Sequence, residues 1–439
     1  MSKLLNRKLL LSGAAGVLVI AGLTVFVLHE DHVRPTTSHS VTHDPKGTKG
    51  NRTSAKLSSA GTNPASSATP LQFEALGHDW RITPSGKLYI SVDGQTYYQV
   101  DPPNLVPQAA SMATVVVTGS TVMVYPYPLP SQSQANPQLT VDVSHDGGST
   151  WSEVQLPAAF TSGPADGQFV VSHGSVVGLL VNDETMPDFL EGQWYQTSND
   201  GVSWTEYHTP QNTGGSQITQ VGSTLWLLAG PAQQQLDEST NGGVSWSAVH
   251  FPGESLDEKT GSGCIDQVYP SIAGELPSGE IALVTSGGPN GGCTGSSIPV
   301  TTTAYESANN GTTWQLIASY TGAGAAIESP PFVTLVQGNS IWIALDLTGQ
   351  PRSLRIQTNG SYSLVPDPPG PSSANYSEPY SLFVNAQGQL QLTLAGQVNV
   401  PSPNAPRVTA TYVSSDQGKT WQRLPVRFLA SGSPIPKQP

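Results

Sequence analysis

The stretch that decides the fold is Ser239-Thr-Asn-Gly-Gly-Val-Ser-Trp246, because its eight-residue pattern occurs five times in the chain. Each copy has Ser or Thr first, Asp or Asn third, Gly fifth, Ser or Thr seventh and Trp last. The residues at the third, fifth and eighth positions are Asp146, Gly148 and Trp151; Asn199, Gly201 and Trp204; Asn241, Gly243 and Trp246; Asn309, Gly311 and Trp314; and Asp416, Gly418 and Trp421. Five of the nine tryptophans stand in this position, so the pattern indicates a structural repeat.

Every residue type in the pattern suits a tight turn between two strands. A short Asp or Asn side chain accepts backbone N–H bonds inside a loop, and Gly supplies the positive φ that a hairpin needs. The Trp is expected to begin the next strand and to bury its ring between neighbouring units. Because three of the five copies have Asn, we interpret these side chains as structural hydrogen-bond acceptors, and no catalytic residue is predicted among them.

Two shortened copies end in tyrosine, at Tyr97 and Tyr362, and bring the number of units to seven. Pro157, Pro210 and Pro252 each follow a Trp by six residues, so we expect the strand after the turn to stop at a proline. A second series of strand–Gly–strand hairpins precedes these turns, around Gly86, Gly119, Gly174, Gly222, Gly279, Gly338 and Gly388.

Two hairpins per unit give four antiparallel strands, which is a propeller blade. The sequence therefore predicts an all-β fold, a single β-propeller of seven four-stranded blades over residues 71–431, with 432–439 as a tail. The first unit, Trp80 to Val100, looks short by a strand. The ring is then expected to close with a C-terminal segment, or else to have six blades.

The front of the chain has a different composition. Lys3, Arg7 and Lys8 precede an uncharged run over residues 9–28, and about 20 residues span a bilayer core as a helix. The basic flank predicts a cytoplasmic N-terminus at residues 1–8, a transmembrane signal-anchor, and a propeller outside the cell at the cell membrane. Cleavage of the run as a signal peptide, with secretion, is the alternative. Residues 29–70 are rich in Ser, Thr, Pro, Gly and Lys and are expected to form a disordered linker.

Charge and motifs exclude several classes of protein. Residues 71–439 hold ten Lys and Arg against 28 Asp and Glu, which leaves no basic footprint for nucleic acid. No phosphate loop, nucleophile elbow or helical zinc motif occurs, and no metal or other cofactor is predicted. Cys264 and Cys293 lie in Gly-rich stretches, and outside the cell they would form one disulfide. Two free thiols are the alternative.

The eight-residue turns resemble the Asp box (BNR repeat) of the sialidase, sortilin and Ycf48-like propellers. In that superfamily the box lies between the third and fourth strands of a blade, away from the active face, and it specifies fold rather than function. Sialidases hold a carboxylate with three arginines. The arginines of the predicted propeller are Arg81, Arg352, Arg355, Arg407, Arg423 and Arg427. None lies between Arg81 and Arg352, so an arginine triad is not evident and typical sialidase activity is not expected.

Two hypotheses of function remain. The first is a membrane-anchored extracellular binding or scaffold module, whose ligand is a glycan or a protein. The alternative is a glycoside hydrolase that uses a carboxylate pair on cell-surface or wall polysaccharide, because two acids suffice for that reaction. Candidate acids outside the boxes are Asp183, Glu184, Asp188, Asp266, Glu328 and Glu378. Their spacing singles out no pair.

Overall fold

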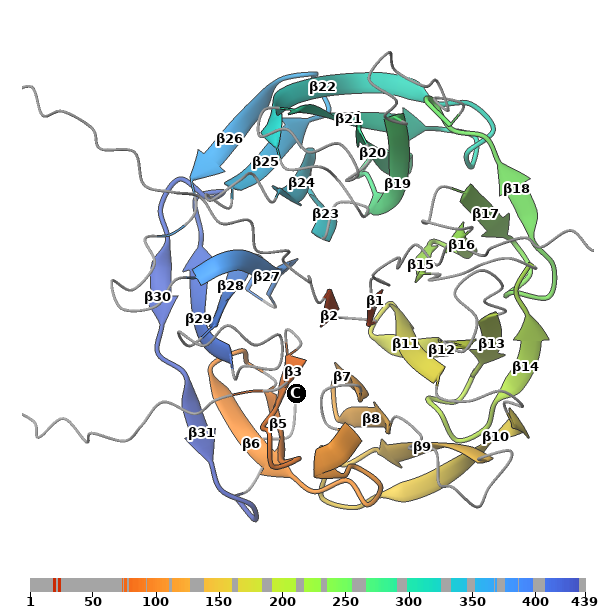
Figure 1. The fold of residues 1–439 in the computed structure, drawn as a ribbon, viewed down its shortest axis with the longest axis vertical. Coiled ribbons are helices and arrows are strands. Elements are labelled where there is room, and N and C mark those ends of the chain that lie inside the picture. Colours follow the sequence, from red (N-terminus) through yellow and green to blue (C-terminus); the bar gives the residue numbers. More distant parts are fainter. Residues whose placement is uncertain are drawn as a thin grey trace, which may run out of the picture.

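The computed structural model shows seven antiparallel sheets arranged in a ring, with the first strand of each sheet nearest the centre (Figure 1). The residues that it describes are 19–20, 23–24, 73, 75–76, 79–91, 93–109, 113–126, 138–159, 165–183, 192–210, 217–229, 235–254, 266–289, 298–324, 333–345, 352–366, 368, 376–385, 387–397 and 407–433. The protein is therefore a seven-bladed β-propeller of four-stranded sheets, as the spacing of the repeats predicts.

Blades 2 to 4 follow one another along the chain, and each runs from the centre to the rim. Blade 2 contains β7 (Thr114–Thr118), β8 (Thr121–Tyr125), β9 (Gln138–Ser144) and β10 (Ser152–Ala159). Blade 3 contains β11 (Ala165–Ser172), β12 (Ser175–Asp183), β13 (Gly192–Gln196) and β14 (Thr205–His208). Blade 4 contains β15 (Gln217–Val221), β16 (Thr224–Ala229), β17 (Gln235–Ser239) and β18 (Ser247–Val249).

Blades 5 to 7 have the same order. Blade 5 contains β19 (Asp266–Glu275), β20 (Ile281–Pro289), β21 (Ile298–Ser307) and β22 (Gln315–Gly324). Blade 6 contains β23 (Val333–Gln337), β24 (Ser340–Leu345), β25 (Arg352–Gln357) and β26 (Tyr362–Pro366). Blade 7 contains β27 (Tyr376–Val384), β28 (Leu390–Gln397), β29 (Arg407–Ser414) and β30 (Gln422–Leu424).

Blade 1 closes the ring. It contains β3 (Ala75–Leu76), β4 (Trp80–Ile82), β5 (Leu88–Ser91) and β6 (Thr96–Val100), and the C-terminal strand β31 (Arg427–Leu429) pairs in parallel with β6 at the rim. The expected closure by a C-terminal segment is thus confirmed. Between Trp80 and Val100 the chain has three strands, so this unit is short by a strand as expected, and the two residues of β3 before it supply the innermost strand.

Two further predictions need correction. The turn at Gly86 joins β4 to β5, the second and third strands of blade 1, whereas the other glycines of its series join first and second strands. The reason is that β3 precedes β4 and takes the place of the first strand. The strand after Trp151 does not stop at Pro157, because β10 runs to Ala159 with a register shift that accommodates the proline on an edge strand.

The hydrophobic core lies between blades rather than within them. Each of six buried clusters combines side chains from two neighbouring sheets, such as Trp194 of blade 3 with Leu227 of blade 4. A seventh cluster joins Phe73, Tyr89 and Tyr97 of blade 1 to Phe428 of β31. The six clusters between blades make each blade dependent on its neighbours.

The front of the chain lies largely outside the described residues. Four residues of the predicted membrane-spanning run are described, and they form a short antiparallel pair, β1 (Val19–Ile20) and β2 (Leu23–Thr24), rather than a helix. Three of the four are β-branched, which favours extended backbone. Among the described residues, no helix has the length and apolar character needed to cross a membrane. The anchor over residues 9–28 and the linker over 29–70 stay predictions.

Candidate functional site

The two faces of the ring are built differently. The box turns between third and fourth strands lie on the same face as the turns between first and second strands, because the Gly147 N–H donates to the Ser120 carbonyl at 2.8 Å. The Thr358 N–H makes the same bond to the Asn339 carbonyl at 3.0 Å in blade 6. We call this the box face. The connections between second and third strands, and from blade to blade, leave from the opposite face.

In the Asp copies of the box, one carboxylate accepts several bonds of the turn. Asp146 Oδ1 accepts the Thr150 N–H and the Ser144 hydroxyl, both at 2.8 Å, and Oδ2 accepts the Thr150 hydroxyl at 2.7 Å. The Gly148 N–H donates to the Ser144 hydroxyl at 2.7 Å. Asp416 makes the same set of bonds in blade 7. The hydrogen-bonding groups of the turn are therefore satisfied within the turn.

The Asn copies keep these contacts by reversing one bond. Asn199 Oδ1 accepts the Ser203 N–H at 2.9 Å, as an Asp would, but its Nδ2 donates to the Ser203 hydroxyl at 2.8 Å. Asn241 and Asn309 bond in the same way. A hydroxyl can donate or accept, so the seventh position serves either partner.

The glycine of the box touches the preceding blade. A Cβ on Gly243 would lie 2.2 Å from the ring of Trp194 in blade 3, and φ at this glycine is +94°. Gly148, Gly201, Gly311 and Gly418 likewise face side chains of the preceding blade at 2.5 to 2.7 Å from the Cβ position. Both the positive φ and the close approach therefore call for glycine.

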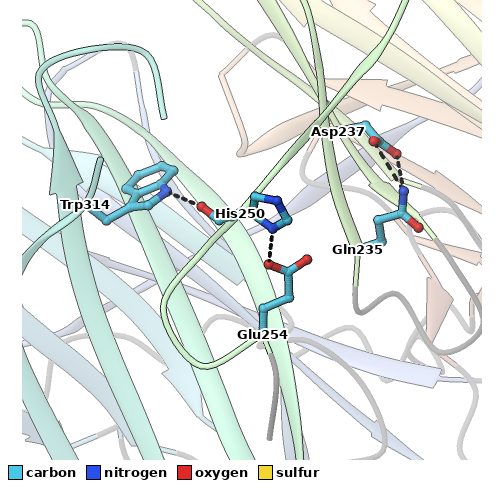
Figure 2. A network of polar contacts seen from close by, with 5 residues as sticks. All are labelled: Gln235, Asp237, His250, Glu254 and Trp314. Atoms are coloured by element: carbon cyan, nitrogen blue, oxygen red, sulfur yellow. Dashed lines mark hydrogen bonds and ion pairs between the residues drawn. The ribbon is translucent and has the colours of Figure 1, made fainter. Parts of the chain in front are cut away.

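The tryptophan of the box also faces the preceding blade. Trp314 of blade 5 packs on the core cluster shared with blade 4, and its indole N–H donates to the His250 carbonyl of blade 4 at 3.1 Å (Figure 2). Trp151, Trp204, Trp246 and Trp421 pack on the corresponding clusters. The box is thus a contact between blades as well as a turn.

Hydrogen bonds inside the turn shift the two box carboxyls toward the charged form. The Thr420 hydroxyl and N–H, with the Ser414 hydroxyl, lower the pKa of Asp416 to about 2. At Asp146, burial raises the pKa, but the bonds from Thr150 and Ser144 outweigh it and lower the pKa overall. A carboxyl held ionised by hydrogen bonds is a poor proton donor at neutral pH.

The structure describes the backbone of three of the six candidate acids, and all three lie on the face opposite the box face. Asp183 ends β12, the second strand of blade 3, and Asp266 begins β19, the innermost strand of blade 5. Glu378 is the third residue of β27, the innermost strand of blade 7. All three therefore lie at strand ends that reach the face opposite the boxes. Glu184, Asp188 and Glu328 lie outside the described residues.

The innermost strands are joined by polar side chains. The Thr114 hydroxyl donates to the Gly167 carbonyl at 2.6 Å, and the Gln168 amide exchanges two bonds with the backbone of Ile218. Ser271 and Thr334 share a hydroxyl bond of 3.1 Å between blades 5 and 6. The centre of the ring is thus polar, and much of its polarity is used in holding blades together.

The arginines occupy separate positions. Arg81 is buried between blades 1 and 7, where one of its Nη atoms donates to the Tyr97 hydroxyl at 3.0 Å and the Thr411 hydroxyl at 3.2 Å. Arg355 lies over the ring of Trp342, 5.8 Å from its centroid. Arg423 and Arg427 are exposed on β30 and β31. The side chains of Arg352 and Arg407 are outside the described part.

The sequence analysis missed two buried carboxyls, Asp142 and Asp237. Both stand on a third strand, two residues before the first residue of the box, where four other blades have Tyr. Burial raises the pKa of each, although bonds from Asn104 to Asp142 and from Gln235 to Asp237 lower it in part. Counting back from the box would have found them.

Figure 2 shows the surroundings of Asp237. Gln235 Nε2 donates to its two carboxylate oxygens at 3.3 and 3.2 Å, while His250 and Glu254 contact each other at 2.8 Å on the connection after β18. Asp142 accepts the Asn104 N–H at 2.9 Å and the Asn104 amide at 2.7 Å. The same amide donates to Glu153 at 2.9 Å, so it links both carboxylates on neighbouring strands. Asp142 is fully buried, and Asn104 belongs to the connection between blades 1 and 2. We therefore interpret the bonds between Asn104 and Asp142 as a contact between blades rather than as a catalytic pair.

The described part of the chain bears on a metal site but not on the predicted disulfide. No group of three or more His, Cys, Asp and Glu side chains able to hold a metal occurs among the described residues. Cys264 and Cys293 lie outside those residues, and their disulfide stays a prediction.

Comparison with known proteins identifies the repeat. Residues 412–423 match the BNR/Asp-box repeat, so the turn that ends at Trp421 is a BNR/Asp-box repeat. No curated protein sequence matches the chain.

Comparison with solved structures finds several of low similarity. The GH93 α-L-arabinofuranosidase of Fusarium graminearum is 14% identical, with 72% of this chain and 96% of that chain covered and a TM-score of 0.42. The α-L-arabinanase of Penicillium chrysogenum is 12% identical, with 78% and 97% covered and a TM-score of 0.41. Polysaccharide lyase Uly1 is 9% identical, with 81% and 92% covered and a TM-score of 0.46. At these values, function has to be inferred from the residues of this chain.

Proposed function

We propose that the protein is an extracellular binding module that holds a glycan or protein ligand on the face opposite the boxes. One contrast carries the proposal. The box face consists of short turns whose Asp and Asn side chains bond within the turn and whose glycines and tryptophans pack against the preceding blade. The opposite face carries the longer connections, such as residues 126–137 and 250–265, and binding sites concentrate on such loops over a rigid scaffold.

The net charge of the propeller restricts the kind of ligand that it can bind. With 28 acidic and ten basic residues in 71–439, the propeller repels polyanions, so a neutral or cationic ligand is expected. The test is a glycan array and a pull-down from the cell surface with the full chain. Binding that is lost on replacing residues 126–137 by a short Gly-Ser linker, and kept when Val244 in a box turn is changed to Ser, supports the proposal. Binding lost only through Val244 would place the ligand on the box face instead.

Glycoside hydrolysis is the second candidate, and the strand-end acids favour it. Asp183, Asp266 and Glu378 belong to three different blades and lie at strand ends on the face opposite the boxes, and this reaction requires two carboxyls about 5 to 10 Å apart around the sugar. Hydrolysis of a panel of polysaccharides and aryl glycosides, followed by reducing-end release, tests it. Loss of activity in Asp266→Asn or Glu378→Gln, with activity kept in Asp146→Asn, supports a catalytic pair. Binding of a polysaccharide without cleavage would support the binding module over the hydrolase.

The location outside the cell and the membrane anchor are part of the same proposal. They rest on the basic residues before the uncharged run at 9–28. Protease treatment of intact cells should digest the propeller and leave a short membrane-bound fragment. A propeller found in the medium with a new N-terminus after residue 28 would instead indicate cleavage and secretion.

A further inference from the structure

The outer strands of the blades are protected against pairing with other strands, with one exception. Native sheets protect their edges with short strands, charges, prolines or a covering segment. Here β18 has three residues, β14 carries Glu206, β30 carries Arg423 and β26 ends at Pro366. β10 has both Glu153 and Pro157, and β6 is covered by β31.

The exception is β22, the outer strand of blade 5. Its ten residues, Gln315-Leu-Ile-Ala-Ser-Tyr-Thr-Gly-Ala-Gly324, include no charged residue and no proline. A register shift opposite Ala304 and Tyr305 is confined to its beginning, and from Ala318 to Gly324 the ladder with β21 is regular. In the described part of the chain, no strand pairs with its outer side. A regular row of backbone N–H and C=O groups is therefore available for pairing.

The blade also extends beyond its neighbours. The strands of blade 5 have nine or ten residues, whereas the outer strands of blades 4 and 6 have three and five. At about 3.3 Å per residue, β22 is longer than β26 by about 16 Å. β22 therefore offers a longer outer edge than the outer strand of either neighbouring blade.

Exposed apolar side chains accompany this edge. Leu316 on β22 is 58% exposed, and Tyr362 at the start of β26 is 53% exposed. Tyr362 is the aromatic residue of a shortened box, and its ring meets that of Tyr320 on β22 edge-on at 5.7 Å. Two of the most exposed large apolar residues of the described part therefore lie beside the unprotected strand.

The composition of β22 suits a second copy of itself. In a two-fold antiparallel pair, each strand faces its own sequence, so any charged residue near the axis faces a like charge. β22 has none. Its outward hydroxyls already have partners in the blade, since Thr321 bonds to Thr301 and Ser319 to Thr303, both at 3.0 Å. Pairing would leave no buried hydroxyl without a hydrogen bond.

We propose that two copies of this chain associate through antiparallel pairing of β22 with β22, which joins their fifth blades into one continuous sheet. This association is separate from the ligand face, because β22 forms part of the rim of the ring (Figure 1).

The test is the mass of the full chain in a mild detergent, measured by analytical ultracentrifugation from about 1 to about 100 μM, the range of weak interfaces. We expect a monomer–dimer equilibrium. Thr321→Lys, which puts a charge on an exposed position of the edge, should raise the dimer dissociation constant by about tenfold or more.

The matched control is Thr205→Lys, at an exposed position on the outer strand β14 of blade 3. It should leave the equilibrium unchanged, and it separates pairing through β22 from association through the N-terminal run. Leu316→Lys is a second variant at an exposed site, in case Thr321→Lys unfolds the blade, which circular dichroism would reveal. The proposal is overturned if the wild-type chain is monomeric at every concentration, or if neither Thr321→Lys nor Leu316→Lys weakens the dimer.

Discussion

The interface between blades 3 and 4 and the seam between blades 7 and 1 solve the same packing problem with different residues. Between blades 3 and 4, the fully buried Trp194 lies against Gly243, and its N–H donates to the Gly242 carbonyl at 2.9 Å. In the seam, the guanidinium of Arg81 lies 4.5 Å from the ring centroid of Tyr97, and Phe428 packs 5.2 Å from the same ring. One interface relies on close packing, the other on a buried cation and an added strand.

The difference follows from chain connectivity. Blades 3 and 4 are joined by a short connection, so little conformational entropy is lost when they pack. The seam joins Arg81 to Thr411, 330 positions away, so closing the ring there loses more conformational entropy. Extra hydrogen bonds, a cation over aromatic rings and β31 offset that larger entropic cost.

The largest expected effect is at the tightly packed interface. Gly243→Ala forces a methyl group into the ring of Trp194 and also strains a residue at φ +94°. We expect the free energy of unfolding to fall by about 4 kcal/mol, from overpacking and left-handed backbone together. Urea denaturation measures it. Gly222→Ala is the control, because φ is +59° but nothing lies within 4 Å, and a loss of about 1 kcal/mol is expected. Equal losses at both sites would mean that backbone strain, not packing, limits this interface.

The seam is tested by Arg81→Met. The variant removes the bonds to Tyr97 and Thr411 and the cation over the rings, and we expect a loss of about 3 kcal/mol in the same measurement. Arg423→Met, at an exposed position on β30, should change the free energy of unfolding by less than about 0.5 kcal/mol. If Arg81→Met proves neutral or stabilising, the cation is not what holds the seam.

A smaller effect is expected from the closing strand. Phe428→Ala removes a ring that contacts Phe73, Tyr89 and Tyr97, and a partly buried aromatic of this kind should contribute about 2 kcal/mol. Amide hydrogen exchange at β6 should also become faster, since the pairing with β31 loosens. Val244→Ala, at a 57% exposed position, is the matched control and should leave both measurements unchanged. Unaltered exchange at β6 would show that the strand pairs without its aromatic anchor.

The smallest effect concerns Asp237, which side-chain alternation along β17 places at the interface of blades 3 and 4. Burial raises its folded-state pKa, so ionisation disfavours the folded state. The stability associated with this carboxyl is complete below its unfolded pKa, near about 4, and is lost as the pH rises through the raised folded value. Asp237→Asn should therefore stabilise the protein slightly at pH 7, by less than about 1 kcal/mol.

Asp416→Asn is the control with the opposite sign. Its folded-state pKa is lowered to about 2, so the stability associated with it is present above about pH 4 and is lost as the pH falls toward 2. Thermal melts of both variants between these limits and pH 7 would show the two trends. Parallel pH profiles for the two variants would contradict the assignment of Asp237 as the buried group.

The sequence predicts the fold well because each box residue meets two requirements at once: the backbone conformation of the turn and the contact with the preceding blade. Gly243 needs both a positive φ and room for Trp194, so few other residues can replace it, and the repeat stays visible. β3 was missed because two residues carry no periodicity. The buried Asp237 was missed because its burial is not visible in the eight residues of the box, although its fixed distance before the box would have pointed to it. The connections on the face opposite the boxes could not be predicted in detail, because they are not constrained by a repeated turn.

The parallel pairing of β31 with β6 has a consequence for biosynthesis. The last strand to be made completes the first blade, so a growing chain holds an open arc of blades until its final residues are available. The exposed end of that arc would be the face of blade 1 that carries Arg81 and Tyr97. A chain that stops before Arg427 would lack this closing strand, so the ring cannot be completed until residues 427–429 have been made.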